Sequence, residues 1–161
     1  MKLRDLKDKD INYDWKTIYV GLNDCFFEPN ILSDYAVELM EKGIEDEFII
    51  ELAWGIAESD LPEKLIDIKN KFFSDVGENS IEYVHEQKKF RYVYLSKLNE
   101  RVFDDVELLN LVTKFYDENG YPDDMISFIN YMPQGKTTTK DELINRFRVF
   151  LDDEKKKVEA Y

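Results

Sequence analysis

Apolar side chains recur along most of the chain at spacings of three and four residues, the period of an amphipathic helix. Near the start, for example, Trp15, Ile18 and Leu22 share one face of a helix. Read in this way, the pattern predicts helices over about residues 14–23, 29–42, 46–57, 60–73, 80–98, 104–119, 122–131 and from 139 towards the C-terminus. Strand-like alternation is weak, and helix is therefore the dominant secondary structure that the sequence predicts.

Residues that begin and end helices lie at the borders of these segments. Gly43 and Gly120 are placed to end helices in the left-handed conformation that suits glycine, and Pro29 fits a first turn. The N-caps that we expect are Asp14, Asp60, Ser80, Asp104 or Asp105, and Thr139, the last in a capping box with Glu142. The borders and the apolar period therefore agree with each other.

The predicted fold class is all-α: a single domain of seven to eight helices, arranged as an irregular bundle or as stacked helical pairs. Residues 89–94 alternate and would suit a strand, but no second segment alternates well enough to pair with them. The domain is expected to span residues 1–161, with 1–12 as a charged lead segment and 134–139 as a flexible loop.

Charge is the most unusual property of the composition. The net charge is −13, and residues 10–67 contain fifteen acidic side chains against three lysines. A field of this sign repels nucleic acid and anionic membranes, and it attracts basic proteins. The plainer interpretation, that the acids only keep the protein in solution, stays open at this point.

The sequence offers little for catalysis or metal binding. It has one histidine, His85, and one cysteine, Cys25, which we expect to be a structural or surface residue and a small buried apolar residue respectively. Adjacent aspartates such as Asp104 and Asp105 point about 100° apart on a helix, so they do not converge on one ion. No catalytic residue, metal ligand or cofactor is therefore predicted.

Cellular location follows from what the chain lacks. A single cysteine excludes an intrachain disulfide, which fits a reducing compartment. No apolar run follows the first five residues, and no stretch approaches the roughly 18 apolar residues of a membrane span. The expected location is the cytoplasm.

Acidic residues and two aromatic residues gather where the second predicted helix meets the third. Tyr35 or Trp54 could serve there as an aromatic anchor for a partner, although Trp54 would equally suit the core. The acids of this predicted partner-binding site are Glu38, Glu41, Glu45, Asp46, Glu47 and Glu51. An alternative interpretation of the same acids is an ordinary solvated helix face.

Two local patterns carry a resemblance to a known family. One is Trp15-x-x-Ile18-Tyr19-x-Gly21-Leu22, and the other is Tyr121-Pro122-x-x-Met125-x-x-Phe128-x-x-Tyr131-Met132-Pro133. With them the chain resembles, over most of its length, a bacterial family catalogued as domain of unknown function 2247. The resemblance implies a short helical protein and brings no catalytic residues. Small acidic proteins of this kind are also similar to immunity proteins, which inactivate a bacterial toxin by covering its active site.

The leading hypothesis is therefore an immunity-type protein whose acids in residues 28–67 hold a basic toxin domain, such as a nuclease, by steric and electrostatic blocking. It has no enzymatic role and binds neither nucleic acid nor membrane. One alternative is an adaptor or assembly subunit that binds its partner through an apolar groove between helices. Another is a metal-dependent hydrolase built on scattered carboxylates. The sequence sets neither the partner's identity nor the oligomeric state.

Overall fold

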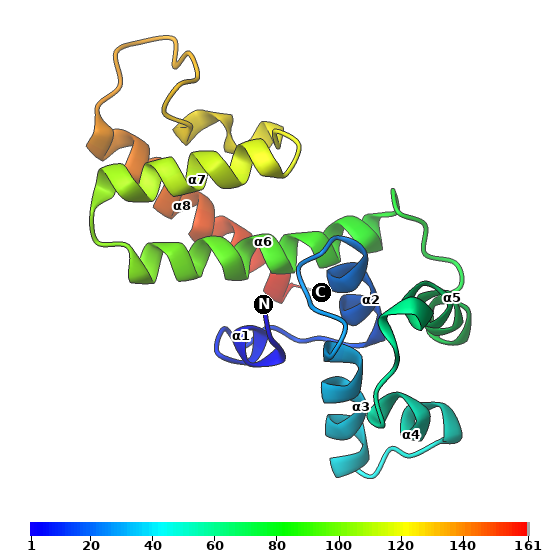
Figure 1. The fold of residues 1–161 in the computed structure, drawn as a ribbon. Coiled ribbons are helices and arrows are strands. Elements are labelled where there is room, and N and C mark those ends of the chain that lie inside the picture. Colours follow the sequence, from blue (N-terminus) through cyan, green and yellow to red (C-terminus); the bar gives the residue numbers. More distant parts are fainter. Residues whose placement is uncertain (161) are drawn as a thin grey trace. The chain divides into compact units, whose positions relative to one another are not determined.

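The computed structural model describes residues 1–160, and all of its regular structure is helical (Figure 1). The helices are α1 (Leu3–Lys7), α2 (Trp15–Asn23), α3 (Ile31–Glu41), α4 (Glu47–Ala53), η1 (Glu58–Asp60), α5 (Leu61–Phe72), α6 (Ile81–Arg101), α7 (Asp105–Glu118), η2 (Asp123–Phe128) and α8 (Lys140–Glu159). The elements η1 and η2 are 3₁₀ helices. The predicted all-α class is confirmed, with eight α-helices in the described part of the chain.

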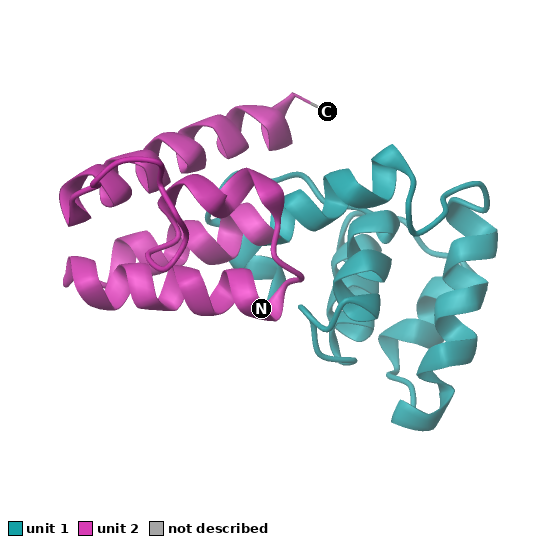
Figure 2. Ribbon diagram, turned by 90° about the horizontal axis from the view of Figure 1, so that it is seen from above, with its two compact units in different colours: residues 1–90 teal, residues 91–161 magenta. Residues whose placement is uncertain are grey.

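The all-α domain is built of two compact units, residues 1–90 and 91–161 (Figure 2). Helix α6 contributes residues to both of them. Within residues 1–160, no helix combines the length and the apolar character that crossing a bilayer requires.

The core of unit 1 is packed around a glycine on α2. Gly21 is buried, and the rings of Phe27 and Phe90 lie where its side chain would be. The ring of Phe90 stacks on Phe26 and meets Phe27 edge-on, each with centroids 5.0 Å apart. Only a residue without a Cβ lets α2 approach these rings so closely.

Unit 2 contains a charged cluster that joins three elements. The Nη1 and Nη2 atoms of Arg91 on α6 donate to both carboxylate oxygens of Asp124 on η2, at 2.9 and 2.8 Å. The Nε atom of Arg91 donates to Glu154 on α8 at 2.9 Å, and Glu154 is fully buried. Lys157 also approaches this glutamate, at 3.3 Å. Arg91 therefore holds η2 and α8 against its own helix.

The predicted helix starts agree well with the structure. Asp14, Asp104 and Thr139 cap α2, α7 and α8 with their side chains. The Ser80 Oγ accepts from the N–H of Tyr83 at 3.1 Å, in the first turn of α6. Asp60 precedes α5, but its side chain makes no capping hydrogen bond.

Several helix boundaries differ from the prediction for local reasons. The helix predicted over 46–57 ends at Ala53, because Gly55 adopts φ +88°. Pro29 lies before the first turn of α3, and residues 122–131 form a short 3₁₀ helix flanked by irregular chain. Residues 89–94 belong to α6, and all of them except Tyr94 are buried or half-buried. A helix that is covered on more than one side loses the regular apolar period of an amphipathic helix.

Three further expectations concern single segments. Within the lead segment 1–12, α1 buries Leu3 and Leu6. Residues 134–139 lie outside the helices, as expected for a loop. Cys25 is exposed, so the prediction of a buried cysteine is wrong: φ of +59° places it in a tight turn after α2 rather than on a core-facing helix position.

Candidate functional site

The six predicted partner-binding acids fall into two groups, and the first is occupied by contacts inside unit 1. Glu38 accepts hydrogen bonds from the Tyr13 hydroxyl at 2.7 and 2.8 Å, and it pairs with Lys7 at 2.8 Å and Lys42 at 2.7 Å. Burial alone would raise the pKa of Glu38, but the hydrogen bonds from these three groups outweigh it and lower the pKa to about 2. Glu38 therefore stabilises the packing of α1 against α3.

Two more of these acids tie α4 to α5. The Asp46 carboxylate accepts from the N–H of Ile49 at 2.9 Å as the N-cap of α4, and it pairs with Lys71 at 2.9 Å. Both contacts lower the pKa of Asp46. Glu51 pairs with Lys64 at 2.7 Å, a contact that raises the pKa of that lysine. A lysine of the same unit therefore already lies beside each of these two acids.

The second group consists of acids that face solvent. Glu41, Glu45 and Glu47 are exposed, and none of them pairs with a Lys or Arg within residues 1–160. They lie at the end of α3, in the turn and at the start of α4. Their charge is therefore available to a partner of opposite sign.

The two aromatic candidates have opposite environments. Tyr35 is only 5% exposed, and its ring meets Trp15 edge-on at 4.7 Å and Tyr13 at 5.7 Å. Burial raises the pKa of Tyr35 to about 12. As a core residue, Tyr35 has no face to offer a partner, and the hypothesis that it is an anchor needs correction. Trp54 is 88% exposed, so the hypothesis that it belongs to the core is wrong.

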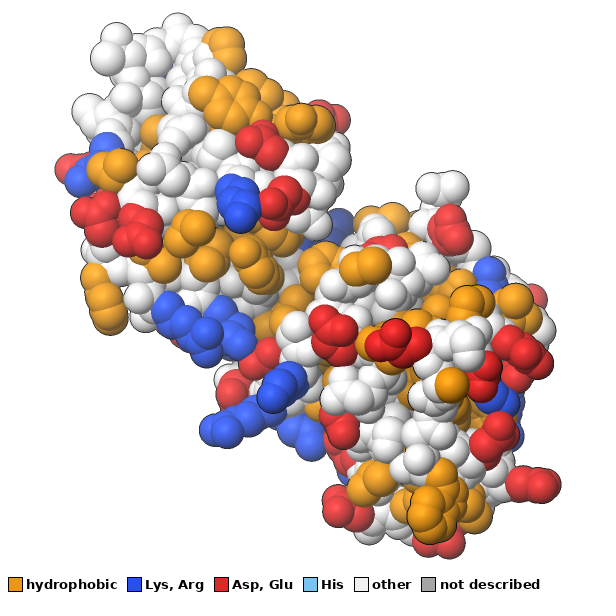
Figure 3. Space-filling view, viewed as in Figure 1, with side chains coloured by type: hydrophobic (Ala, Val, Ile, Leu, Met, Phe, Trp, Pro, Cys, Tyr) orange, Lys and Arg blue, Asp and Glu red, His pale blue; other side chains and the backbone are white. Residues whose placement is uncertain are grey.

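Trp54 lies on the outer face of α4, which we call the α4 surface and define as Glu47, Ile50, Glu51 and Trp54. Spacings of three, four and seven residues place these four side chains on one side of the helix, and all four are exposed. Ile49 and Leu52, on the opposite side, are buried against the rest of unit 1. Figure 3 shows hydrophobic side chains beside acidic ones at the α3–α4 end of unit 1.

An acidic recess opens beside the end of α4. Its volume is about 570 Å³, and its lining comes from Glu28, Pro29, Asn30, Ser33, Gly55, Ile56 and Glu58. The Ser33 hydroxyl donates to the carbonyl of Ala53 at 2.9 Å, which fixes α3 to the last turn of α4. The recess has two carboxylates and no basic residue in its lining. Its chemistry suits a cationic or hydrogen-bond-donating group.

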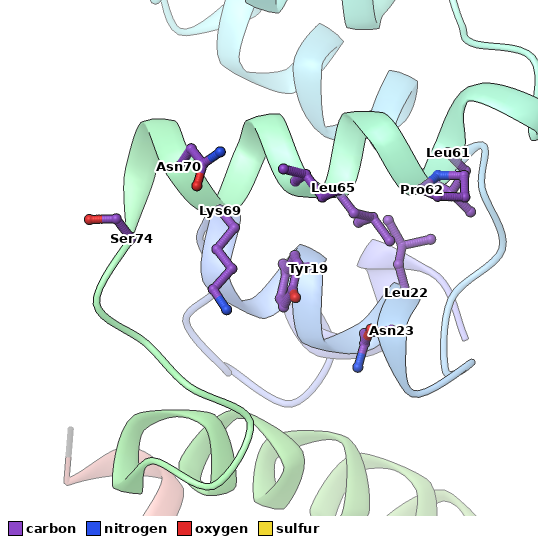
Figure 4. Close-up of a pocket in the computed structure, with 10 residues that line it drawn as sticks. Tyr19, Leu22, Asn23, Leu61, Pro62, Leu65, Lys69, Asn70 and Ser74 are labelled. Atoms are coloured by element: carbon purple, nitrogen blue, oxygen red, sulfur yellow. The ribbon is translucent and has the colours of Figure 1, made fainter.

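A groove runs between α2 and α5 in the same unit (Figure 4). Its volume is about 720 Å³, and its lining consists of Tyr19, Leu22, Asn23, Leu61, Pro62, Leu65, Ile66, Lys69, Asn70 and Ser74. Figure 4 shows the Lys69 side chain extending from α5 towards α2, beside the Tyr19 ring. The middle of the groove is apolar and one end is polar.

No group of three His, Cys, Asp or Glu side chains within residues 1–160 is arranged to hold a metal ion. His85 is buried on α6, and burial lowers the pKa of its imidazole. Its neighbour Glu86 accepts from the Thr17 hydroxyl at 2.7 Å and pairs with Lys89 at 2.9 Å. These polar groups join α2 to α6.

A family model described as an uncharacterized protein conserved in bacteria (DUF2247) matches residues 3–155. The chain belongs to this family. The match begins at α1 and extends into α8, and it therefore includes both compact units. Neither the curated proteins nor the solved structures contain a match to the chain. The family's description names no activity, and functional arguments for this DUF2247 member therefore depend on its own surface.

Sequence reasoning missed two parts of this surface. The acidic recess joins Glu28 to Glu58, which are thirty positions apart, and no local pattern links them. The face of α4 could have been found from its spacing, because Glu47, Ile50 and Trp54 follow a helical period. The spacing does not tell whether another part of the folded protein covers that face.

Stability should depend on pH through Glu38. Because the folded pKa of about 2 is below the unfolded value of 4.5, the contribution of Glu38 is complete above pH 4.5 and is lost as pH falls towards 2. After allowance for solvent screening, we expect Glu38→Gln to cost about 1–2 kcal/mol at pH 7. Urea unfolding at intervals from pH 7 to pH 2 measures this.

The exposed Glu41, one turn further along α3, provides the matched control. Glu41→Gln should leave the free energy of unfolding unchanged over the same range, since this carboxylate has no partner among residues 1–160. Equal pH profiles for the two variants would contradict the role assigned to Glu38.

Proposed function

We propose that this protein binds a basic protein through the α4 surface and the acidic recess beside it. The observation that carries the proposal is the 88% exposure of Trp54 on a helix face that also presents Glu47 and Ile50. In its most specific form the proposal is an immunity-type role in the bacterial cytoplasm, in which the partner is a basic toxin domain, for instance a nuclease, that is blocked sterically and electrostatically.

The argument from Trp54 is energetic. A tryptophan buries roughly 150–250 Å² when it is covered, and contacts of this kind dominate the affinity of many interfaces. Ile50, one turn earlier and also exposed, extends the apolar area along α4. Docking of a partner on this face would remove both side chains from water.

The argument from charge sets the sign of the partner. Glu41, Glu45 and Glu47 have no basic partner in residues 1–160, and Glu28 and Glu58 line a recess that has no basic side chain in its lining. A partner's lysine or arginine side chain entering the recess would meet two carboxylates. Complementary charge of this kind speeds association and excludes acidic competitors.

The proposal also explains why part of the acidic segment is paired internally. Lys64 and Lys71 hold α5 against α4 through Glu51 and Asp46, and Lys7 holds α1 against α3 through Glu38. A helix fixed in this way presents Trp54 with little loss of conformational entropy on binding. In this proposal the internal ion pairs fix the helices, and the solvent-facing acids bind the partner.

The test is co-expression with the product of the adjacent gene, followed by a toxicity assay and calorimetry on the purified pair. The wild-type protein should relieve toxicity and form a complex that weakens as salt rises. Trp54→Ala should weaken the complex about 30-fold, the effect of losing a central aromatic anchor. Quenching of Trp54 fluorescence by acrylamide should fall when the partner binds.

Two controls keep the test specific. Phe103, 92% exposed in unit 2, is an aromatic residue outside the α4 surface, and Phe103→Ala should bind like the wild type. Glu58→Lys should weaken binding, whereas Asp152→Lys on the exposed side of α8 should not. Absence of a complex at low salt, together with unaltered toxicity, would refute the proposal.

The groove between α2 and α5 supports a second candidate, an adaptor or assembly subunit. Leu22, Leu61 and Leu65 line the groove with apolar side chains, against which the apolar face of an amphipathic segment could pack. This candidate predicts a complex with little dependence on salt and no sensitivity to Trp54→Ala. The same calorimetry therefore separates the two functions.

A further inference from the structure

Three tyrosine rings form a cluster at the turn between α7 and η2 in unit 2, and we call Tyr116, Tyr121 and Tyr131 the tyrosine cluster. The Tyr116 ring meets Tyr121 edge-on with centroids 5.4 Å apart, and it meets Tyr131 at 6.4 Å. Tyr116 is buried, whereas Tyr121 and Tyr131 are 58% and 54% exposed. Two ring faces therefore remain available to solvent around a buried third ring.

The backbone holds Tyr121 in a conformation that its side chain type rarely adopts. Gly120 and Tyr121 have φ of +76° and +58°, and the N–H of Tyr121 donates to the carbonyl of Tyr116 at 3.1 Å. A tyrosine in the left-handed region is unfavourable, and such positions cluster at functional sites. The turn is what brings the Tyr121 ring against Tyr116.

Two carboxylates act on these rings, since the charges of Asp123 and Asp117 both raise the pKa of Tyr116. Two other acids in residues 116–131 are paired with basic side chains: Asp124 with Arg91 at 2.8 Å and Glu118 with Lys114 at 3.7 Å. The Tyr131 hydroxyl donates to Asp117 at 2.6 Å. Figure 3 shows acidic side chains beside hydrophobic ones over this end of α7.

Asp117 and Asp123, together with burial, raise the pKa values of two of the tyrosines. The hydrogen bond to Asp117 and burial raise the pKa of Tyr131 to about 12. Burial raises the pKa of Tyr116, and the charges of Asp123 and Asp117 raise it further. Both phenols therefore stay neutral at physiological pH, and Asp117 and Asp123 are the carboxylates that would attract a cation to the cluster.

We propose that the tyrosine cluster binds an arginine side chain of a basic polypeptide. The faces of aromatic rings attract cations, and a planar guanidinium can stack on one ring while it donates to a nearby carboxylate. Asp117 is placed to accept such a bond, since only one of its two oxygens receives the Tyr131 hydroxyl. The negative surroundings oppose any anionic ligand.

A polypeptide suits this site better than a free small cation. Both outer rings are more than half exposed, and a small ligand would keep most of its hydration there. A side chain that belongs to a larger partner gains further contacts around the cluster, so a weak individual interaction suffices. The inference does not depend on the α4 surface, which belongs to the other unit.

The experiment is a titration of the full chain, labelled with ¹³C in its tyrosine rings, with a capped peptide of alternating glycine and arginine. The ring resonances of Tyr121 and Tyr131 should shift, and the matched peptide with citrulline in place of arginine should leave them unchanged. Citrulline keeps the shape of arginine without its charge. The comparison therefore isolates the cationic contribution.

Two variants test the rings without disturbing the fold. Tyr121→Asn removes the ring while it suits the left-handed backbone, and it should weaken the apparent affinity for the arginine peptide about fivefold. Tyr121→Phe keeps the aromatic face and should bind within about twofold of the wild type. Melting temperatures of both variants show whether they are folded.

Two further variants define the location. Phe103→Leu, at an exposed aromatic residue elsewhere in unit 2, should leave the titration unchanged. Trp54→Ala should also leave it unchanged, which separates this inference from the proposed function. Equal shifts with the citrulline peptide, or an unchanged affinity in Tyr121→Asn, would overturn the inference.

Discussion

Arg91→Ala is expected to lower the free energy of unfolding by about 3–5 kcal/mol, the usual cost of removing one partner from a buried ion pair. The change leaves Glu154, which is fully buried on α8, without its closest cation. It also frees Asp124 on η2, which receives two hydrogen bonds from the same guanidinium. Lys157 remains 3.3 Å from Glu154, so the lower part of this range is the more realistic.

Urea unfolding at pH 7 measures the effect, and two comparisons make it specific. Arg148 is exposed on α8 without a partner in residues 1–160, and Arg148→Ala should cost less than about 0.5 kcal/mol. The double variant Arg91→Met with Glu154→Met should recover much of the loss, because apolar residues of similar volume often replace a buried ion pair without penalty. A loss below about 1 kcal/mol in Arg91→Ala would contradict the assigned role.

Gly21→Ala should cost about 3 kcal/mol, the upper part of the range for overpacked cores. In a helix interior, alanine is normally more favourable than glycine by about 1 kcal/mol. A loss of stability in Gly21→Ala would therefore have the opposite sign to the effect of helix propensity. A Cβ at position 21 would lie 2.6 Å from the Cζ of Phe90 and closer still to the Cδ2 of Phe27. Both rings are buried and have little room to move.

Gly77→Ala provides the matched control for this prediction. Gly77 lies in the break before α6, where an added Cβ would meet nothing within 4 Å. Its free energy of unfolding should change by less than about 0.5 kcal/mol. The same small change in Gly21→Ala would show that α2 can shift away from the rings.

Local signals account for how well the helices could be predicted. Asp14, Ser80, Asp104 and Thr139 begin helices through hydrogen bonds to residues two or three positions further along. Such contacts depend on near neighbours in the sequence, and they survive almost any tertiary arrangement. Gly55 was missed, because its φ of +88° ends α4 earlier than the apolar period suggests.

The candidate site could be predicted only in part. Glu41, Glu45 and Glu47 face solvent, as the predicted partner-binding site requires, and their role in binding stays a prediction. Glu38 was grouped with them because it has the same charge. Its carboxylate is instead in contact with Lys7 of α1, Tyr13 before α2 and Lys42 at the end of α3. Spacing along a helix gives no information about which lysine lies opposite.

The sequence by itself determined the all-α class, most helix starts, the family and the concentration of acids in residues 10–67, because these depend on composition and on contacts between near neighbours. Only the tertiary structure decided that Trp54 is exposed while Tyr35 is buried, although both are aromatic residues on amphipathic segments. It also decided which acids have internal partners. The physical reason is that burial and ion pairing depend on residues far away in the chain, which meet only when the helices pack.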